Sequence, residues 1–289
     1  MKIVTATQMQ ALDRRTITEA HITGLTLMEH AGTGVVAAME HAYGPLINKR
    51  VTILCGKGNN GGDGFVVGRL LRRKRARPSV LLLARAKDLQ GDAVRMYRRF
   101  VAASGSASVQ VNPNTDCVRS QLQSADLVVD ALLGTGLSSP VSGTYETAIG
   151  LLNEISAEKQ YPVVAVDLPS GIHADTGAVL GAAARASLTV TFGLPKMGLY
   201  LGEGIDHAGQ VRIFDIGIPR SYAGSIESRV SLITPEHVRQ LIPRRLPSAH
   251  KGTYGHAAII AGSIGKSGAA AMAATAALRI GTGLVTVAT

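Results

Sequence analysis

Tryptophan is absent from this chain of 289 residues, and aromatic residues make up only 4% of it. A core built on large aromatic rings is therefore excluded, and the interior must be aliphatic. Only two cysteines occur, Cys55 and Cys117, so the chain has no disulfide framework of the kind that holds small secreted domains together. This cysteine content is typical of a reducing compartment, and we expect a cytoplasmic protein.

Long hydrophobic runs are also missing. Residues 1–15 contain no apolar segment of the kind found in a signal peptide. The longest apolar stretch, residues 257–289, is rich in alanine and glycine and is interrupted by Lys266 and Arg279. We therefore do not expect a membrane span or a membrane partner.

Acidic residues are fewer than basic ones, 20 against 30, which gives a net charge of +10. Much of the excess lies in residues 69–77, at the expected end of a helix, where cations offset the negative end of the helix dipole. No aromatic residue is interleaved there to stack on bases, so we expect no nucleic-acid partner. A solvated helix end is the favoured interpretation, and a surface for an anionic ligand or partner is the alternative.

Short aliphatic runs alternate with amphipathic segments from residue 51 to about 215. The runs are continuously apolar, which is typical of parallel strands covered on both faces. The pattern predicts an α/β protein with a three-layer α/β/α, Rossmann-like parallel sheet, flanked by an amphipathic segment over residues 5–42. The expected strands are 51–55, 79–84, 108–111, 126–132, 162–167, 187–192 and 210–214, and the expected helices lie near 63–75, 91–103, 116–124 and 144–158.

The character of the chain changes after residue 218. We expect a first domain over residues 1–222, a linker over 223–250, and a single βαβ unit over 251–289. A unit of that size cannot cover both faces of its own sheet. We therefore interpret it as the incomplete start of a second domain, and packing on the first domain is the alternative.

A glycine-rich segment, GKGNNGGDG at residues 56–64, lies between the first expected strand and a helix. Its glycines match the GxGxxG spacing of dinucleotide-binding turns, and amides at the following helix start can bind phosphate. Two amides and an acid replace the small residues of such a turn, and Arg85 and Lys87 stand where an acid would hold the ribose. A tight turn with Asp63 as helix N-cap is the alternative.

Two carboxylates close apolar runs further along the chain. Asp130 and Asp167 each precede a glycine-containing loop, and the carboxyl ends of parallel strands share one edge of the sheet. Asn60, Asp130 and Ser170 would together offer only oxygen ligands, which suits a hard cation and not zinc. Asp167 is instead a candidate general acid or base. Capping of the next helix is the alternative for both aspartates.

These segments resemble the NAD(P)H-hydrate epimerase family (YjeF N-terminal domain). The resemblance covers residues 1–220 and is carried by VTILCGKGNNGGDGFVVGRLL, VVDALLGTGLSSPVSGTY, VVAVDLPSGIHADTG, TVTFGLPKMGLYLGEG and VRIFDIGIP. It implies an isomerase that interconverts the R and S forms of hydrated NADH and NADPH (NADHX and NADPHX) at C6. It also implies one potassium ion held by Asn60, Asp130 and Ser170, and proton transfer by Asp167. The implied substrate contacts are Asn59, Asn60, Gly61, Gly62, Asp63, Gly134, Thr135, Gly136, Leu137, Ser138, Ser139, Pro140 and Asp167.

A second resemblance begins at residue 250. The segment HKGTYGHAAIIAGSIGKSGAAAMAATAALRIGTGLVTVAT is similar to the opening of the ADP-dependent NAD(P)H-hydrate dehydratase domain, which has a ribokinase-like fold. The resemblance implies a bifunctional parent protein and places Ala270 near a substrate contact. The catalytic GxGD motif of that family lies further on, so we expect ADP or ATP binding and lyase activity only in a full-length chain.

Other interpretations stay open. The literal GxGxxG with Arg85 and Lys87 downstream would also fit an NADP-dependent oxidoreductase. A non-catalytic nucleotide-binding module is a third hypothesis. Lys196 can contact a substrate phosphate, stabilise its loop or lie in solvent, and the N-terminal helices offer an interface for a homodimer or higher oligomer.

Overall fold

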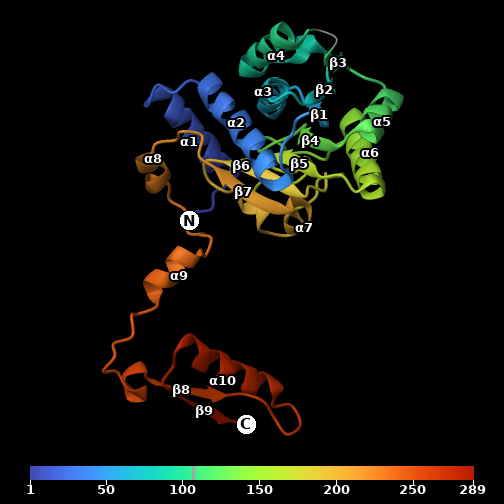
Figure 1. Cartoon of the computed structure of the whole chain (residues 1–289). Coiled ribbons are helices and arrows are strands. Elements are labelled where there is room, and N and C mark those ends of the chain that lie inside the picture. The colour runs from blue at the N-terminus through green and yellow to red at the C-terminus, as the bar shows by residue number, and fades with distance from the viewer. Residues whose placement is uncertain (106–107) are drawn as a thin grey trace. The chain divides into compact units, whose positions relative to one another are not determined.

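The computed structural model describes residues 1–105 and 108–289, and the chain divides into two compact units, Met1–Leu232 and Ile233–Thr289. The first unit is built on a seven-stranded sheet in the order β3-β2-β1-β4-β5-β6-β7 (Figure 1). All six strand pairs are parallel, which confirms the predicted fold class. The strands are β1 (Arg50–Cys55), β2 (Arg77–Leu82), β3 (Val109–Val111), β4 (Leu127–Ala131), β5 (Val163–Val166), β6 (Leu188–Phe192) and β7 (Gln210–Phe214).

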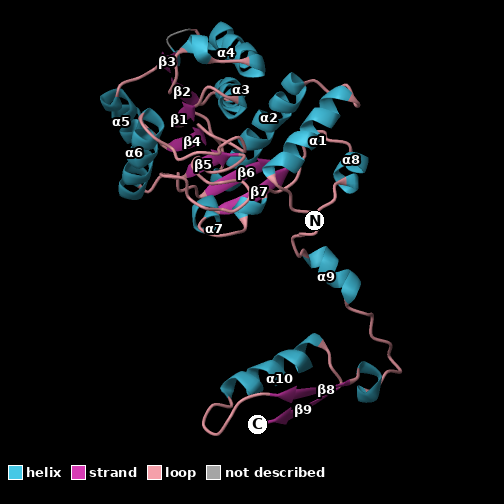
Figure 2. Ribbon diagram, turned by 180° about the vertical axis from the view of Figure 1, so that it is seen from behind, coloured by secondary structure: helices cyan, strands magenta, loops and turns pink. Residues whose placement is uncertain are grey.

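Helices cover both faces of this sheet (Figure 2). One core cluster joins the sheet to helices α1 to α4, and a second joins its other face to α5 and α6. Alternate residues of one strand divide between them: Ile53 belongs to the first cluster and Leu54 to the second. The helices are α1 (Ala6–Thr18), α2 (Gly24–Tyr43), α3 (Asn59–Arg73), α4 (Gly91–Ser104), α5 (Thr115–Ser124), α6 (Thr144–Lys159), α7 (Gly204–Ala208) and α8 (Arg220–Ser225).

The amphipathic N-terminal segment forms α1 and α2, and α2 packs against α3 and the strands β6 and β7. Thr5 caps α1 with a capping box in which Gln8 is the partner. Among the described residues no helix is both long and apolar enough to cross a lipid bilayer.

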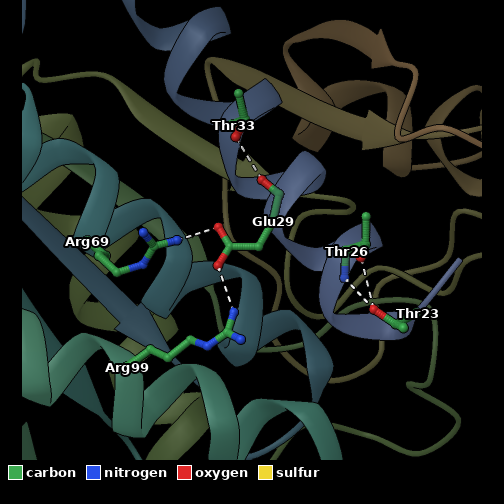
Figure 3. A network of polar contacts seen from close by, with 6 residues as sticks. All are labelled: Thr23, Thr26, Glu29, Thr33, Arg69 and Arg99. Carbon is green, nitrogen blue, oxygen red and sulfur yellow. Dashed lines mark hydrogen bonds and ion pairs between the residues drawn. The ribbon is translucent and has the colours of Figure 1, made fainter.

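The basic segment at the end of α3 differs from the expected solvated helix end at one position. Arg69 is buried, with 8% of its surface exposed, and it pairs with Glu29 of α2 (Figure 3). Glu29 also accepts a hydrogen bond from Arg99 of α4 at 3.2 Å. Glu29 therefore joins three helices through Arg69 and Arg99, whereas Arg72 and Arg73 are exposed.

The first unit extends past residue 222 because the chain returns to its own N-terminus. The amide of Ile3 donates to the carbonyl of Val230 at 3.0 Å, and the amide of Leu232 donates to the carbonyl of Met1 at 2.7 Å. These bonds fix residues 226–232 along the first strand-like segment of the chain. The boundaries at residues 222 and 250 stay predictions about the family domains.

The second unit contains α9 (Pro235–Leu241), β8 (His256–Ile260), α10 (Gly268–Ile280) and β9 (Leu284–Ala288). β8 and β9 form a two-stranded parallel sheet, as expected for one βαβ unit. Ala270 is its one buried residue among those described, and Ile260 is 87% exposed. Two strands and one long helix therefore bury little apolar surface of their own.

Candidate active site

A pocket of about 730 Å³ lies at the carboxyl ends of the central strands. Chain order reverses between β1 and β4, because β1 leads through α3 to β2 on one side while β4 leads to β5 on the other. Such a switch point leaves a crevice in which doubly wound proteins bind their ligands. Segments that follow β1, β4, β5 and β6 line the pocket, together with one face of α1 and the start of α2.

The helix that follows the glycine-rich segment begins at an earlier residue than the expected residue 63. α3 begins at Asn59, and its N-cap is Gly58, which has no side chain to cap it. Asp63 lies inside the first turns of the helix, so the interpretation of Asp63 as N-cap is wrong. Asn59, Asn60 and Asp63 line the pocket from this helix start, where free backbone amides favour an anion.

Gly61 and Gly62 are required for close packing at the same place. A Cβ atom on Gly61 would lie 1.9 Å from the carbonyl oxygen of Gly56, and one on Gly62 would lie 2.7 Å from the sulfur of Met28. Neither glycine lines the pocket as Asn59 and Asn60 do. Their small size lets the first turn of α3 approach β1 and α2.

Asn60, Asp130 and Ser170 meet beneath the pocket. The hydroxyl of Ser170 donates to Asp130 Oδ1 at 2.6 Å, and the Ser170 amide donates to Oδ2 at 2.8 Å. The carbonyl of Leu133 accepts from the Ser170 hydroxyl at 3.2 Å and from the Asn60 side-chain amide at 3.0 Å. Three segments far apart in the sequence thus bring four oxygen atoms into one small region.

Asp130 is fully buried, and this burial raises its pKa, although hydrogen bonds from Ser170 and Leu132 oppose the shift. In the described part of the chain no lysine or arginine forms an ion pair with it. A buried carboxylate without a counter-charge is costly. The oxygen-rich surroundings and the missing positive charge together fit a small hard cation.

Asp167 and Lys196 form a buried ion pair at the pocket wall. Lys196 Nζ lies 2.6 Å from Asp167 Oδ1, and Thr191 donates its hydroxyl to the same oxygen at 3.2 Å. Asp167 has a φ of +68°, in the left-handed region that is uncommon for residues other than glycine. Strained backbone of this kind is concentrated at functional sites, and here it turns the carboxylate of Asp167 into the pocket.

Lys196 is only 1% exposed, which excludes the solvated role. Its ammonium group donates to Asp167, to the Thr191 hydroxyl at 3.1 Å and to the Phe192 carbonyl at 2.9 Å. These three acceptors use all three N–H groups of a lysine. The geometry therefore supports the role in holding the loop, and Lys196 fixes the position of Asp167.

The loop after β4 supplies the opposite wall. Among its predicted contacts, Pro140 is exposed and lies outside the pocket lining, and Ala270 belongs to the second unit. The members of the loop that line the pocket are Gly134, Thr135, Gly136, Leu137, Ser138 and Ser139.

Sequence reasoning missed Asp13 on α1, which also lines the pocket. Its Oδ1 is buried and has no hydrogen-bond partner among the described residues. Burial raises the pKa of Asp13 to about 6, with Lys196 lowering it and Asp167 raising it. The available signal was an acid spaced four residues from the buried Met9 on an amphipathic helix.

Asp63 is a third acid in the same pocket. Burial raises its pKa well above the ordinary value, and the charges of Asp167 and Asp13 raise it further, while Lys196 lowers it. Three carboxyl groups thus share a single buried lysine. Such groups cannot all ionise at once, which is typical of sites that transfer protons.

Known proteins are similar to this chain over most or all of its length. The chain is 43% identical over its whole length to a protein of Moorella thermoacetica named bifunctional NAD(P)H-hydrate repair enzyme Nnr, of which it covers 54%. It is 39% identical over 73% of its length to the NAD(P)H-hydrate epimerase of Limosilactobacillus fermentum, of which it covers 95%. The chain thus spans about half the length of the bifunctional relatives and nearly all of the shorter one.

A solved structure and a family model complete the comparison. The crystal structure of the yeast protein ynu0 has a TM-score of 0.65 and 21% identity, covering 82% of this chain and 98% of the yeast chain, and it supports the same fold. The model of the family described as YjeF-related protein N-terminus matches residues 24–198, which supply most of the residues that line the pocket. The chain belongs to this family of YjeF-related N-terminal domains.

Proposed function

We propose that this chain is an isomerase that interconverts the R and S forms of hydrated NADH and NADPH. The observation that carries the proposal is the pocket at the switch point, where Asp167 is held by Lys196 beside a glycine-rich helix start. Its volume of about 730 Å³ falls within the range of pockets that hold small organic ligands. The names of the relatives supply the substrate class, since one that the chain covers almost completely is an NAD(P)H-hydrate epimerase.

Substrate binding follows from the two walls of the pocket. The amides at the start of α3 favour the negative charge of a nucleotide phosphate, and the Asn59 and Asn60 side chains add donors and acceptors. We assign the remaining contacts to Asp63, to residues 134–139 and to Asp167, and Pro140 stays a predicted contact outside the pocket lining. Gly61 and Gly62 allow the start of α3 to pack closely enough to form this wall of the pocket.

A potassium ion is part of the proposal. Asn60, Asp130 and Ser170 would hold it, with the Leu133 carbonyl beside them. When bound, the ion supplies the positive charge that the buried Asp130 lacks. Asp130 and Ser170 link the loop after β4 to the loop after β5, so they fix two walls of the pocket relative to each other.

Asp167 is the residue to which we assign proton transfer. Its carboxylate lines the pocket, and the hydrogen bonds from Lys196 and Thr191 hold one oxygen in place. A side chain fixed in this way can take or give a proton without reorganising.

The test is chiral chromatography of a mixture of R and S NADPHX incubated with this protein and a separate S-specific dehydratase. If the chain is an epimerase, the dehydratase consumes the whole mixture, because R is converted to S as S is removed. If R persists and declines only at its spontaneous rate, the proposed function is wrong.

Asp167→Asn tests the assigned residue. Asparagine has the same shape and tolerates a left-handed backbone, but it cannot transfer a proton. We expect the rate of interconversion to fall about 10²- to 10⁴-fold with substrate binding retained. Asp206→Asn, an exposed acid outside the pocket, is the control and should leave the rate unchanged. Full turnover by Asp167→Asn would remove Asp167 from the mechanism.

The alternatives give different readouts. An NADP-dependent oxidoreductase would change the absorbance of the intact nicotinamide, and epimerisation does not. Arg85, the residue that motivated that hypothesis, forms an ion pair with Asp88 at 2.9 Å. A non-catalytic nucleotide-binding module would bind NADPHX without changing the ratio of its isomers.

We further propose a cytoplasmic location, in keeping with the two free cysteines, and self-association through the N-terminal helices. The ADP- or ATP-dependent dehydration that the second resemblance implies is not assigned to the βαβ unit alone. Ala270 stays a predicted substrate contact of that second activity.

A further inference from the structure

The N-terminal segment places α1 next to Lys196. The amide of Val4 donates to the carbonyl of Pro195 at 2.9 Å, and the amide of Met197 donates to the carbonyl of Val4 at 3.0 Å. These two bonds lie on either side of Lys196 in the sequence. Because Thr5 then caps α1, the helix starts at the loop that carries the buried lysine.

One face of α1 forms a wall of the pocket. Met9, Asp13 and Ile17 are spaced by four residues, so they lie one above another on the helix, and all three line the pocket. In this stripe of three residues only Asp13 is polar, and Gln10 and Arg14 of the same helix line the pocket beside it. A carboxyl group at that position loses its water without gaining a partner: Asp13 Oδ1 is buried and accepts no hydrogen bond among the described residues.

Asp13 and Asp167 therefore have opposite surroundings. Asp167 pairs with the ammonium group of Lys196 and accepts a hydroxyl hydrogen bond, which are the contacts of an ionised carboxylate. Asp13 lies on an apolar face with an unpartnered oxygen, which is the setting of a neutral carboxyl group. Pairs of acids with such different environments are typical of an acid and a base that act together.

We propose that Asp13 is a second catalytic residue, the general acid that acts on the C6 hydroxyl group of the substrate while Asp167 acts as the base. The inference rests on the proposed function and adds a residue to it. None of the site residues implied by the family resemblance or by the glycine-rich and strand-end motifs lies on α1.

The chemistry balances without a further reactant. The carboxyl group of Asp13 gives its proton to the C6 hydroxyl group, the C–O bond breaks with its electron pair on oxygen, and water leaves as the ring nitrogen shares its lone pair with C6. Water then adds to the other face of the planar C6, and Asp167 takes a proton from it. One water leaves and one adds, and nothing is oxidised. Asp167 then releases its proton to solvent and Asp13 takes one from solvent, which restores both groups for the next turnover. The reverse reaction uses the two acids in exchanged roles.

The charges around Asp13 agree with this assignment. Its pKa of about 6, raised by burial, keeps a protonated fraction near neutral pH. The groups that face it are Lys196, which lowers its pKa, and Asp167, which raises it, with Asp63 on α3 close enough to be coupled to it. The other charged residues of the pocket are Arg14, Lys57 and Asp92.

The test is Asp13→Asn in the whole chain, with R to S interconversion of NADPHX followed from pH 5 to 9. We expect kcat to fall at least 10²-fold with little change in KM, and the wild-type decline above about pH 6 to disappear in the variant. Glu19→Gln, a carboxyl-to-amide change at the C-cap of the same helix and outside the pocket, is the matched control. Asp13→Glu should restore part of kcat and the decline with pH.

The outcomes separate this inference from the function on which it rests. If the wild-type chain does not interconvert the isomers, the proposed function fails. If the wild type is active and Asp13→Asn keeps its kcat, or loses kcat but keeps the decline above pH 6, Asp13 is not the acid. A fold check by circular dichroism identifies a variant that has lost its structure, and Asp13→Glu then serves as the test through its pH profile.

Discussion

Three aspartates that line the pocket, Asp13, Asp63 and Asp167, have the same side chain but different surroundings. Asp167 has an ammonium partner, Asp13 has an oxygen with no partner, and Asp63 is buried on a helix start. The chemistry available to each follows from these contacts and not from the residue type. Charge pairing favours a base, and desolvation favours an acid.

The burial of Asp13 also predicts how the free energy of unfolding depends on pH, and this prediction can be tested without substrate. The pKa of Asp13 is raised to about 6 in the folded chain from 3.8, so the folded state holds its proton more tightly than the unfolded state does. The free energy of unfolding therefore falls as the pH rises from about 4 to about 6, and it is level above that range. Asp13→Asn lacks this loss, and we expect it to be more stable than the wild type at pH 8, by about 1–3 kcal/mol.

Urea unfolding at pH 8 and pH 4 measures the effect. The advantage of the variant should narrow toward pH 4, where the wild-type carboxyl group is neutral in the fold and is close to its pKa of 3.8 in the unfolded chain. Equal free energies of unfolding at pH 8 would show that the site does not disfavour the charge of Asp13.

At the scale of helices, Glu29 holds α2, α3 and α4 together (Figure 3). Its two carboxylate oxygens take one arginine each, the buried Arg69 and the more exposed Arg99. Thr33 donates to the Glu29 carbonyl at 2.8 Å one turn further along α2. These three helices cover one face of the sheet, and the glycine-rich start of α3 lies at the pocket.

Glu29→Gln removes the charge and leaves Arg69 buried without an anion. We expect the free energy of unfolding to fall by about 2–4 kcal/mol, because an uncompensated buried charge is costly. Glu40→Gln is the matched control on the same helix: Glu40 pairs with Lys74, which is 53% exposed, so its loss should cost less than about 1 kcal/mol. Chemical denaturation measures the free energy of unfolding of both variants. Equal losses of this free energy would contradict the role of Glu29 in holding the three helices together.

For the molecule as a whole, the parallel sheet decides where the site lies. Every crossover brings the chain back to the same edge, so segments following β1, β4, β5 and β6 meet at the switch point. The proposed potassium ion would bind where the segments after β1, β4 and β5 converge. Its binding should therefore stabilise the whole first unit and not a single loop.

Potassium dependence of thermal unfolding tests this point. At a K⁺ concentration about ten times the dissociation constant, binding contributes about 1.4 kcal/mol, which raises the Tm of a domain of this size by about 3–6 °C over choline at equal ionic strength. Asp130→Asn removes the buried charge and should lose the difference between the two salts. The same Tm in both salts for the wild type would contradict the potassium site.

The sequence predicted most elements of the first unit because continuous aliphatic runs identify buried parallel strands. It placed the start of α3 too late, since asparagine and glycine are typical of turns although Asn59 opens a helix here. It treated Arg69 as solvated because the partner, Glu29, lies on another helix. Both errors arise where a distant segment overrides a local preference.

Local pattern alone determined the fold class of this chain, the order of its strands and helices, and the edge of the sheet to which its motifs would come. Only the tertiary structure decided which side chains meet there. It buried Lys196 against Asp167, and it brought Asp13 from the first helix into a pocket built on strands that follow much later. The reason is physical: periodicity reports whether a residue faces a core, whereas desolvation and pairing depend on which neighbours the fold supplies.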